Sequence, residues 1–306
     1  MFNKKTYIQR RTLLKKQMNG GIALFLANNE APIHYADNTY HFRQDSTFSY
    51  FFGLNNPGFA AVIDFDEGKE IIFGNDFTIN DIVWMGPQPT VKQLAAKCGI
   101  ANTKPYDELA AYLKDMVRCG RKIHFLPQYR HDNVLTVSKL LGIDPFRIDE
   151  YVSVKLMKAI ISLRSVKSKE EIDEIEKAIS ISYEMHTAAM RFTKAGMVEQ
   201  EIAGFVEGIA LSMGSGTSFP IIFTKNGQTL HNHFHGNILG DGDLVIHDSG
   251  AETEELYASD ITRTFPVSGR FTPKQREIYE IVLKANLEAI KMTKPGITNK
   301  MVHLKA

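Results

Sequence analysis

Short apolar runs alternate with amphipathic segments through the first half of the chain. The apolar runs are bounded by glycine, asparagine, proline or charged residues, which is typical of buried β-strands. They comprise residues 22–27, 60–65, 69–73 and 122–126. Between them, residues 92–97 and 107–117 have apolar positions at helical spacing. Alternating strands and helices favour an α/β layer with a substantial parallel component. The stretch YFFGLNNPG, residues 50–58, predicts a further strand that ends in a turn.

A different pattern begins near residue 164. Ser168 and Glu171 have the spacing of a capping box, in which each side chain accepts a hydrogen bond from the other residue's backbone N–H. Apolar residues then recur at intervals of about 3.6 residues, which predicts a long amphipathic helix. A second helix is predicted over about residues 198–213.

Strand-like pieces follow these two helices, over residues 218–224, 243–248 and 256–265. Thr272 followed by Pro273 predicts an N-cap and the first position of another helix. This half is therefore expected to be α+β, with helices packed on a mainly antiparallel sheet. We expect the domain boundary near residues 160–166, between domains of residues 1–163 and 164–306.

Composition and charge are those of an ordinary globular protein of about two domains. The 306 residues are 43% hydrophobic and carry a formal charge of +1, which disfavours a disordered chain. Near-neutral charge gives no general electrostatic reason to bind nucleic acid or an anionic membrane.

No apolar run approaches the length of a membrane helix. The apolar residues 21–27 are too few, and lack a cleavage site, for a signal peptide, so a cytoplasmic location is expected. Two cysteines are too few for a disulfide scaffold.

Two carboxylates interrupt consecutive apolar strands near the end of the chain. Asp248 lies in LVIHDSG, residues 244–250, and Asp260 in YASDITRTF, residues 257–265. An uncompensated carboxylate on a core strand is costly, and a divalent cation shared by both is the simplest compensation. Oxygen donors of this kind suit Mg²⁺ or Mn²⁺. The alternative is structural: Asp248 caps a turn and Asp260 pairs with Arg263.

A histidine cluster, LHNHFH, is the second chemical feature. If the segment is extended, His231, His233 and His235 lie on one side, as a zinc site or as one catalytic histidine with two exposed neighbours. Spacing leaves both readings open. His247 is expected on the opposite face of its strand from Asp248. The chain has no phosphate-binding P-loop, no Gly-x-Ser-x-Gly elbow and no His-Glu-x-x-His helix, so nucleotide-dependent and serine-hydrolase functions have no support.

The segments around both aspartates resemble a known family. DSG at 248–250, the stretch YASDITRTFPVSG at 257–269 and FTPKQREIY at 271–279 are similar to the metal-binding region of aminopeptidase P, a pita-bread metallopeptidase. FRQDSTFSYFFGLNNP, residues 42–57, resembles the family's creatinase-like N-terminal domain, and LRSVKSKEEI, residues 163–172, its entrance to the catalytic domain. The resemblance spans essentially the whole chain. It implies an α/β N-terminal domain and an incomplete α+β pita-bread catalytic domain.

The resemblance also implies roles for individual residues. Asp248 corresponds to a carboxylate that chelates one metal ion, and Asp260 to the carboxylate that bridges two. His231 stands where the family has a histidine that contacts substrate and stabilises the tetrahedral intermediate. Trp84 resembles a tryptophan that reaches a neighbouring subunit's active site in tetrameric relatives. His233 and His235 have no implied role.

The implied reaction removes the first residue from peptides whose second residue is proline. In the family, two Mn²⁺-type ions activate the hydroxide that attacks the scissile carbonyl, and a carboxylate shuttles the proton. The implied partners are proline-containing peptides and further copies of the chain in a homo-oligomer. Creatinase shares the fold but lacks the metal-binding aspartates, so Asp248 and Asp260 argue against it.

The family's remaining ligands, a histidine and two glutamates, lie beyond the position that corresponds to Ala306. We therefore expect a C-terminally truncated chain whose two carboxylates bind two metal ions weakly and which is inactive alone. Two alternatives stay open. One is a prolidase, which cleaves dipeptides only, and the other is a non-catalytic remnant that serves oligomerisation or peptide binding.

Overall fold

The computed structural model describes residues 1–306, which divide into two compact units. The first comprises Met1–Ile172 and the second Asp173–Ala306. The division into domains of residues 1–163 and 164–306 stays a prediction.

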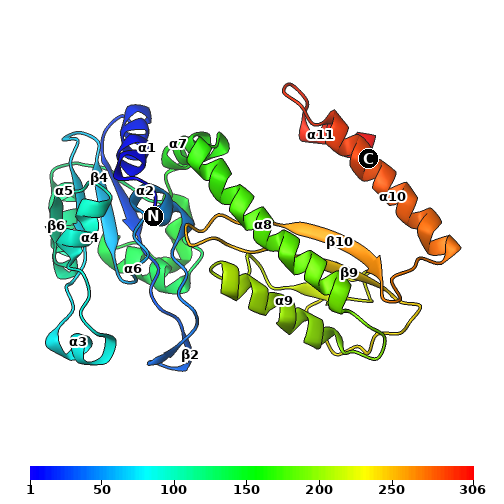
Figure 1. The fold of residues 1–306 in the computed structure, drawn as a ribbon. Helices are drawn as coiled ribbons and strands as arrows, with labels where there is room; N and C mark the ends of the chain where they lie inside the picture. Colours follow the sequence, from blue (N-terminus) through cyan, green and yellow to red (C-terminus); the bar gives the residue numbers. More distant parts are fainter. The chain divides into compact units, whose positions relative to one another are not determined.

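A five-stranded sheet forms the centre of the first unit, in the order β6-β5-β4-β1-β7 (Figure 1). The central strands are β1 (Ile22–Leu26), β4 (Ala60–Asp64) and β5 (Glu70–Phe73), and the outer ones are β6 (Asn102–Lys104) and β7 (Ile123–His124). The pairs β1–β4 and β4–β5 are antiparallel, whereas β1–β7 and β5–β6 are parallel. The predicted α/β layer with a parallel component is therefore confirmed.

Helices and one small hairpin complete this unit. The helices are α1 (Lys4–Gln17), α2 (Ser46–Phe52), α3 (Ile79–Met85), α4 (Val91–Lys97), α5 (Leu109–Arg118), α6 (His131–Leu141) and α7 (Val154–Ser165). Two 3₁₀ turns, Tyr106–Glu108 and Pro145–Tyr151, and the hairpin of β2 (Pro32–Tyr35) and β3 (Asn38–Thr39) lie between them. Every residue of β1 and β4 is buried, because helices cover both faces of the sheet.

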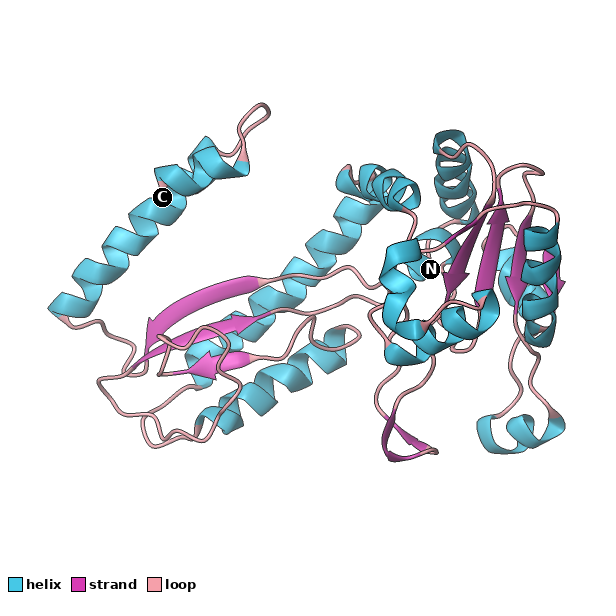
Figure 2. Cartoon of the chain, turned by 180° about the vertical axis from the view of Figure 1, so that it is seen from behind, coloured by secondary structure: helices cyan, strands magenta, loops and turns pink.

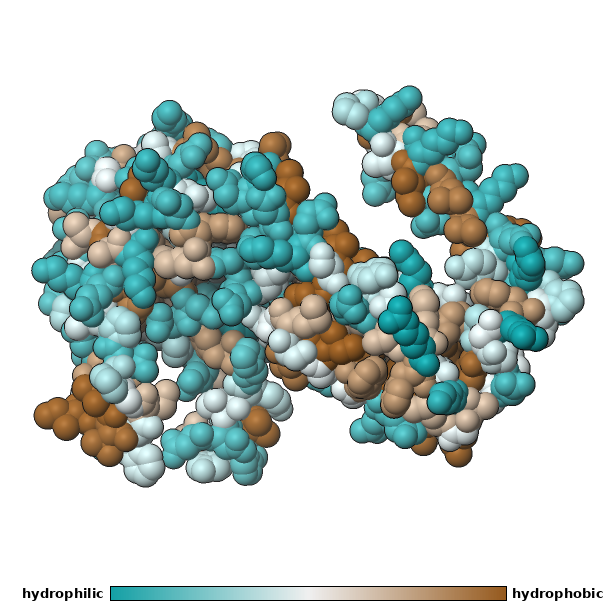
Figure 3. All heavy atoms as spheres, in the orientation of Figure 1, coloured by the Kyte–Doolittle hydropathy of each residue, from teal (hydrophilic) through white to brown (hydrophobic).

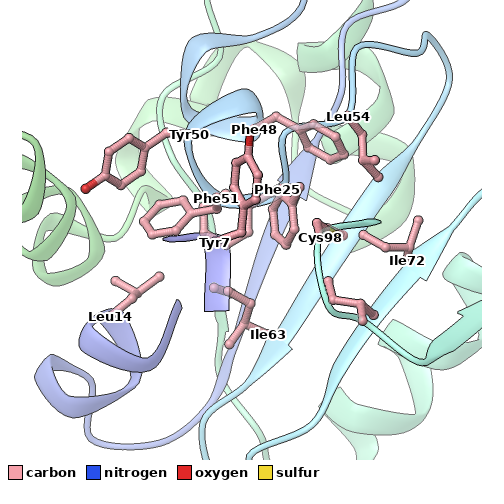
Figure 4. Packing of buried hydrophobic residues seen from close by; sticks show 14 of the residues in the cluster. Tyr7, Leu14, Phe25, Phe48, Tyr50, Phe51, Leu54, Ile63, Ile72 and Cys98 are labelled. Carbon is pink, nitrogen blue, oxygen red and sulfur yellow. The ribbon is translucent and has the colours of Figure 1, made fainter. Parts of the chain in front are cut away.

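One face of the sheet packs on a core that is rich in aromatic residues (Figure 4). Phe25 of β1 contacts the rings of Phe51 and Phe52, with ring centroids 5.5 and 5.6 Å apart. Both of these rings belong to α2, which corrects the strand predicted at residues 50–58. Asp45 caps this short helix by accepting from two backbone N–H groups, and Gly53, at φ 61°, ends it. Because all its aromatic rings are buried, the run had the pattern of a buried strand.

Two buried arginines of α1 connect this helix to the rest of the unit. Arg11 is fully buried and donates to the carbonyls of Phe51 and Cys98, each at 2.8 Å, and to Glu70 Oε2 at 2.9 Å. Arg10 donates to a carbonyl at the end of α2, and its guanidinium lies 4.0 Å from the Tyr50 ring centroid. Each buried guanidinium is thus compensated by protein oxygens or rings, as a buried charge requires.

The second unit begins within α8 (Lys169–Phe192), whose first four residues belong to the first unit, and continues with a second long helix, α9 (Glu199–Met213). A three-stranded antiparallel sheet follows, in the order β10-β9-β8, formed by β8 (Ile222–Thr224), β9 (Leu244–Ser249) and β10 (Ile261–Pro266). The helices α10 (Pro273–Met292) and α11 (Asn299–Lys305) end the chain. The predicted helices and antiparallel sheet are confirmed, but residues 218–221 and 256–260 lie outside the strands where strands were predicted.

The helices α8 and α9 cover one face of this sheet (Figure 2). Their apolar side chains pack with Phe223, Val245 and Phe265 in a single core. The predicted capping box at the start of α8 is formed, since Ser168 N–H donates to Glu171 Oε2 at 2.9 Å. No residue of α10 is buried.

None of the helices combines the length and the hydrophobicity that a membrane span requires. Both cysteines are free, with Cys98 buried and Cys119 exposed.

Replacing Arg11 by alanine should lower the free energy of unfolding of the first unit by about 3–5 kcal/mol, because it removes a buried charge partner. Urea unfolding followed by circular dichroism, with hydrogen exchange of β1 to assign the transition, measures the loss. Lys16→Ala, an exposed change on the same helix, is the control. Equal stability of the two variants would contradict the structural role of Arg11.

Candidate active site

The register of β9 and β10 places Asp248 and Thr262 on one face of the sheet, and Asp260 adjoins the start of β10. Thr262 of β10 pairs directly with Asp248 of β9. Asp260 precedes Thr262 by two residues, next to the start of β10, so its side chain is expected on the same face as that of Thr262. Asp248 and Asp260 are therefore expected to be diagonal neighbours on adjacent chain segments.

The opposite face of β9 belongs to the core. Val245, His247 and Ser249 are buried, whereas Asp248 is only partly so and Asp260 is exposed. His247 packs between Phe223 and His186 of α8, with ring centroids 5.5 and 4.2 Å away. The predicted direction of His247, away from the face of Asp248, is confirmed. One face of β9 thus stabilises the fold, and the other presents a carboxylate.

Neither aspartate has a cationic partner. Asp248 Oδ1 accepts a hydrogen bond from Thr262 Oγ1 at 2.8 Å, and Asp260 makes no hydrogen bond or ion pair. Arg263 donates instead to the Thr262 carbonyl, at 2.8 Å. The structural alternative, in which Asp260 pairs with Arg263, is therefore not formed.

The segment that carries the three histidines folds over the same face of the sheet. It leaves β8 after Thr224, whose side chain shares a face with Ile222, the residue paired with Asp248. Asn232 donates to Thr224 Oγ1 at 3.3 Å. A Cβ on Gly227 would lie 3.3 Å from the side chain of Ile246.

The three histidines do not form a zinc site. Their segment is a turn followed by irregular chain rather than a strand, so the period of two does not apply. His231 and His233 are exposed, whereas His235 Nε2 lies 3.1 Å from the Ile221 carbonyl. Across the chain, no group of three or more histidine, cysteine, aspartate or glutamate side chains could hold a metal ion. The zinc interpretation is therefore wrong.

Trp84 lies in the first unit, on the short helix α3. Its side chain is 78% exposed, and Ile79 and Val83 of the same helix are 83% and 75% exposed. Figure 3 shows the resulting apolar patch over α3. Within its own unit, Trp84 is therefore available to a binding partner.

Sequence reasoning missed two residues of this region. Thr262 holds one oxygen of Asp248, and its position two residues after Asp260 was the available signal. Glu199, the first residue of α9, is fully buried and accepts from Lys225 N–H at 2.8 Å and from Asn237 Nδ2 at 2.9 Å. These partners lie on either side of the histidine segment, and no local pattern links them to Glu199.

Burial lowers the pKa of His247 to about 3, with a smaller contribution from the neighbouring His186. Burial is also the main cause that lowers the pKa of His186. Both imidazoles are therefore neutral at pH 7. His247 Nε2 lies 2.8 Å from Ser249 Oγ, and both nitrogens of His186 are buried without a hydrogen-bond partner.

Comparisons with known families agree with this two-part architecture. Residues 7–124 match the aminopeptidase P N-terminal domain, and residues 173–306 match metallopeptidase family M24. The chain thus has an aminopeptidase P-type N-terminal domain followed by a mixed α/β catalytic fold of the pita-bread type.

Individual relatives agree with the family models. The chain is 30% identical to the Xaa-Pro aminopeptidase of Haemophilus influenzae over 98% of its own length and 69% of that protein. It is 28% identical to a human Xaa-Pro dipeptidase over 91% of its length and 57% of that protein. A zinc-substituted Escherichia coli aminopeptidase P in complex with product superposes with a TM-score of 0.86 at 28% identity, covering 99% of this chain and 71% of that one.

The fold and these relatives define the class as a two-domain M24 metallopeptidase, and the chain belongs to the aminopeptidase P family. It spans 47–69% of the length of the first curated relatives that it matches.

The buried imidazole of His247 should make the second unit less stable in acid. An unfolded histidine has a pKa of about 6.5, so between that pH and about 3 the unfolded chain binds more protons. The free energy of unfolding should therefore fall by about 2 kcal/mol from pH 7 to pH 5 through His247 alone. Urea unfolding at both pH values measures this decrease in the free energy of unfolding. The decrease should be smaller in His247→Phe than in the wild-type chain, and it should equal the wild-type decrease in the control His233→Phe, at an exposed position. An identical fall in all three proteins would refute the assignment.

Proposed function

We propose that this chain provides part of the active site of a metal-dependent Xaa-Pro aminopeptidase, which releases the first residue of peptides that have proline second. One observation carries the proposal: Asp248 of β9 has no cationic partner, and neither has Asp260, which adjoins the start of β10 and is expected on the same face of the sheet. Two adjacent carboxylates without such a partner repel each other and favour a divalent cation.

The donor set fits one part of a divalent-metal site. Asp248 is proposed to chelate one ion and Asp260 to bridge two, with Mn²⁺ as the metal, because oxygen donors suit hard or borderline ions. When bound, such ions supply Lewis-acid activation of the scissile carbonyl and of the attacking water. In this chain, Thr262 holds Asp248 through one oxygen and leaves the other free to bind metal.

Two further residues are proposed to contact substrate. His231, exposed on the segment that crosses the face of Asp248, is proposed to stabilise the tetrahedral intermediate. Trp84 is proposed to serve the active site of a neighbouring copy, which requires a homo-oligomer, and its 78% exposure supports this role. The proposed location is the cytoplasm.

A prolidase activity is the second candidate, because human Xaa-Pro dipeptidase matches 91% of the chain at 28% identity. The chemistry would be the same, and only the accepted length of peptide would differ. Neither Asp248 nor Asp260 distinguishes between the two.

Asp260→Asn should lower Mn²⁺ affinity at least about 10-fold, because it removes one of two carboxylates from a site that otherwise has water as its ligand. Isothermal titration calorimetry measures the Mn²⁺ affinity of the 306-residue chain. We expect this affinity to be low. Asp241→Asn, an exposed aspartate of the same unit without a partner, is the control. Mn²⁺ affinity that is the same in both variants would refute the metal-binding role of Asp260.

Peptide hydrolysis tests the proposed activity and separates the two candidates. Since the chain spans 69% of the E. coli Xaa-Pro aminopeptidase, we would assay it alone and joined to the part of that relative outside the matched region. The chain alone should be inactive, because two carboxylates leave most metal coordination positions to water. The joined protein should release alanine from Ala-Pro-Ala with Mn²⁺, and Asp260→Asn should abolish this.

Cleavage of Ala-Pro but not Ala-Pro-Ala would favour the prolidase. Turnover that survives in Asp260→Asn would contradict both candidates.

A further inference from the structure

Glu199 is the one carboxylate of the second unit that is completely buried at the start of a helix and contacts chain far away in sequence. Its hydrogen-bond partners are the Lys225 backbone N–H, at 2.8 Å from Oε1, and Asn237 Nδ2, at 2.9 Å from Oε2. Neither partner is a cation. The nearby Lys225 ammonium group pairs instead with Asp243, at 3.1 Å. A charge buried without an ion pair is costly, so its hydrogen bonds and the helix N-terminus must stabilise it.

The two partners of Glu199 are the ends of the histidine segment. Residues 225–237 leave β8 at Lys225 and return at Asn237, and His231 lies at their centre. The two carboxylate oxygens therefore connect the start and the end of this segment through one side chain. We name residues 225–237 the histidine loop.

Backbone contacts strengthen the same junction. Glu199 N–H donates to the Asn237 carbonyl at 3.0 Å, and Gln200 N–H donates to the His235 carbonyl at 2.9 Å. The Lys225 ammonium group donates to the Ile238 carbonyl at 2.9 Å. Both ends of the histidine loop are thus fixed at the N-terminus of α9, which packs in the core of the unit.

The centre of the histidine loop has few contacts of its own. His231, His233 and Phe234 are exposed, and the side chain of Asn232 holds the centre to the sheet at Thr224. When a loop's own contacts are sparse, the positions of its ends determine the space that its centre can occupy. Asn232 lies at Thr224, on the face of the sheet that bears Asp248, so the position of its neighbour His231 near that face depends on the junction at Glu199.

We propose that Glu199 is a positioning residue, which fixes both ends of the histidine loop and so holds His231 over the carboxylate-bearing face of the sheet. The catalytic meaning of this role rests on the proposed function. The role itself is a property of the fold, and it can be measured without metal or substrate.

Hydrogen exchange of the 306-residue chain tests the proposal. Glu199→Ala should accelerate exchange of residues 226–236 by about 10-fold or more, and leave β9 and β10 unchanged, because only the loop loses its attachment. Glu199→Gln should restore slow exchange, since its amide oxygen can accept from Lys225 N–H while its NH₂ group donates to a flipped Asn237 side chain. Glu207→Ala, at an exposed position of the same helix, is the control.

A second variant keeps the test decisive if Glu199→Ala fails to fold. Asn237→Asp places a second carboxylate next to that of Glu199, at one end of the loop. Repulsion between the two should loosen residues 226–236 without disturbing the buried core. The NMR signal of the His231 ring, assigned with His231→Ala, should move toward its unfolded position in Asn237→Asp and stay native in Glu199→Gln.

Unchanged exchange of the loop in Glu199→Ala or Asn237→Asp, or equal acceleration in β9 and the loop, would overturn the positioning role. Mn²⁺ binding distinguishes this result from failure of the proposed function. Glu199 does not contact Asp248 or Asp260, so its variants should keep the wild-type Mn²⁺ affinity. If the wild-type chain does not bind Mn²⁺, the proposed function is rejected and the positioning role of Glu199 is unaffected.

Discussion

The antiparallel register between β9 and β10 is the constraint on which the candidate site depends. It sets Thr262 opposite Asp248, and the alternation of side chains is expected to bring Asp260, next to the start of β10, to the same face. A slip of one residue would turn a whole strand over and carry its carboxylate into the core. The register is stabilised from the other face, where Val245 and Phe265 pack against α8 and α9. Burial of apolar side chains on one side of the sheet therefore determines which carboxylate is presented on the other side.

Charge compensation separates the structural groups of this chain from the functional candidates. Arg11 and Glu199 are completely buried, and each makes short hydrogen bonds to protein groups. Asp248 has one hydroxyl partner, and Asp260 has none. The chain thus satisfies the charges that it needs for folding and leaves uncompensated the pair that we propose as metal ligands.

The histidine loop connects the start of α9 with the face of the sheet that presents Asp248. Its ends are fixed at the start of α9, and its centre lies on the face of the sheet that presents Asp248. The rings of His186 and His247, tilted by 38° with centroids 4.2 Å apart, lie on the opposite face of the sheet, neutral and buried. Burying two imidazoles costs stability in acid, and their side chains fill the core directly behind the strand that bears Asp248.

Local sequence determined most of the elements, because hydrophobic period, capping residues and turn residues act over a few positions. The long helices, the antiparallel sheet and the direction of His247 followed from it. The aromatic run at α2 did not, because a fully buried short helix and a buried strand have the same apolar pattern. Only the tertiary structure decided that Arg263 turns away from Asp260, that the three histidines do not converge and that Glu199 joins both ends of their loop. These are contacts between residues distant in sequence, and strand pairing and chain return set them rather than any local spacing.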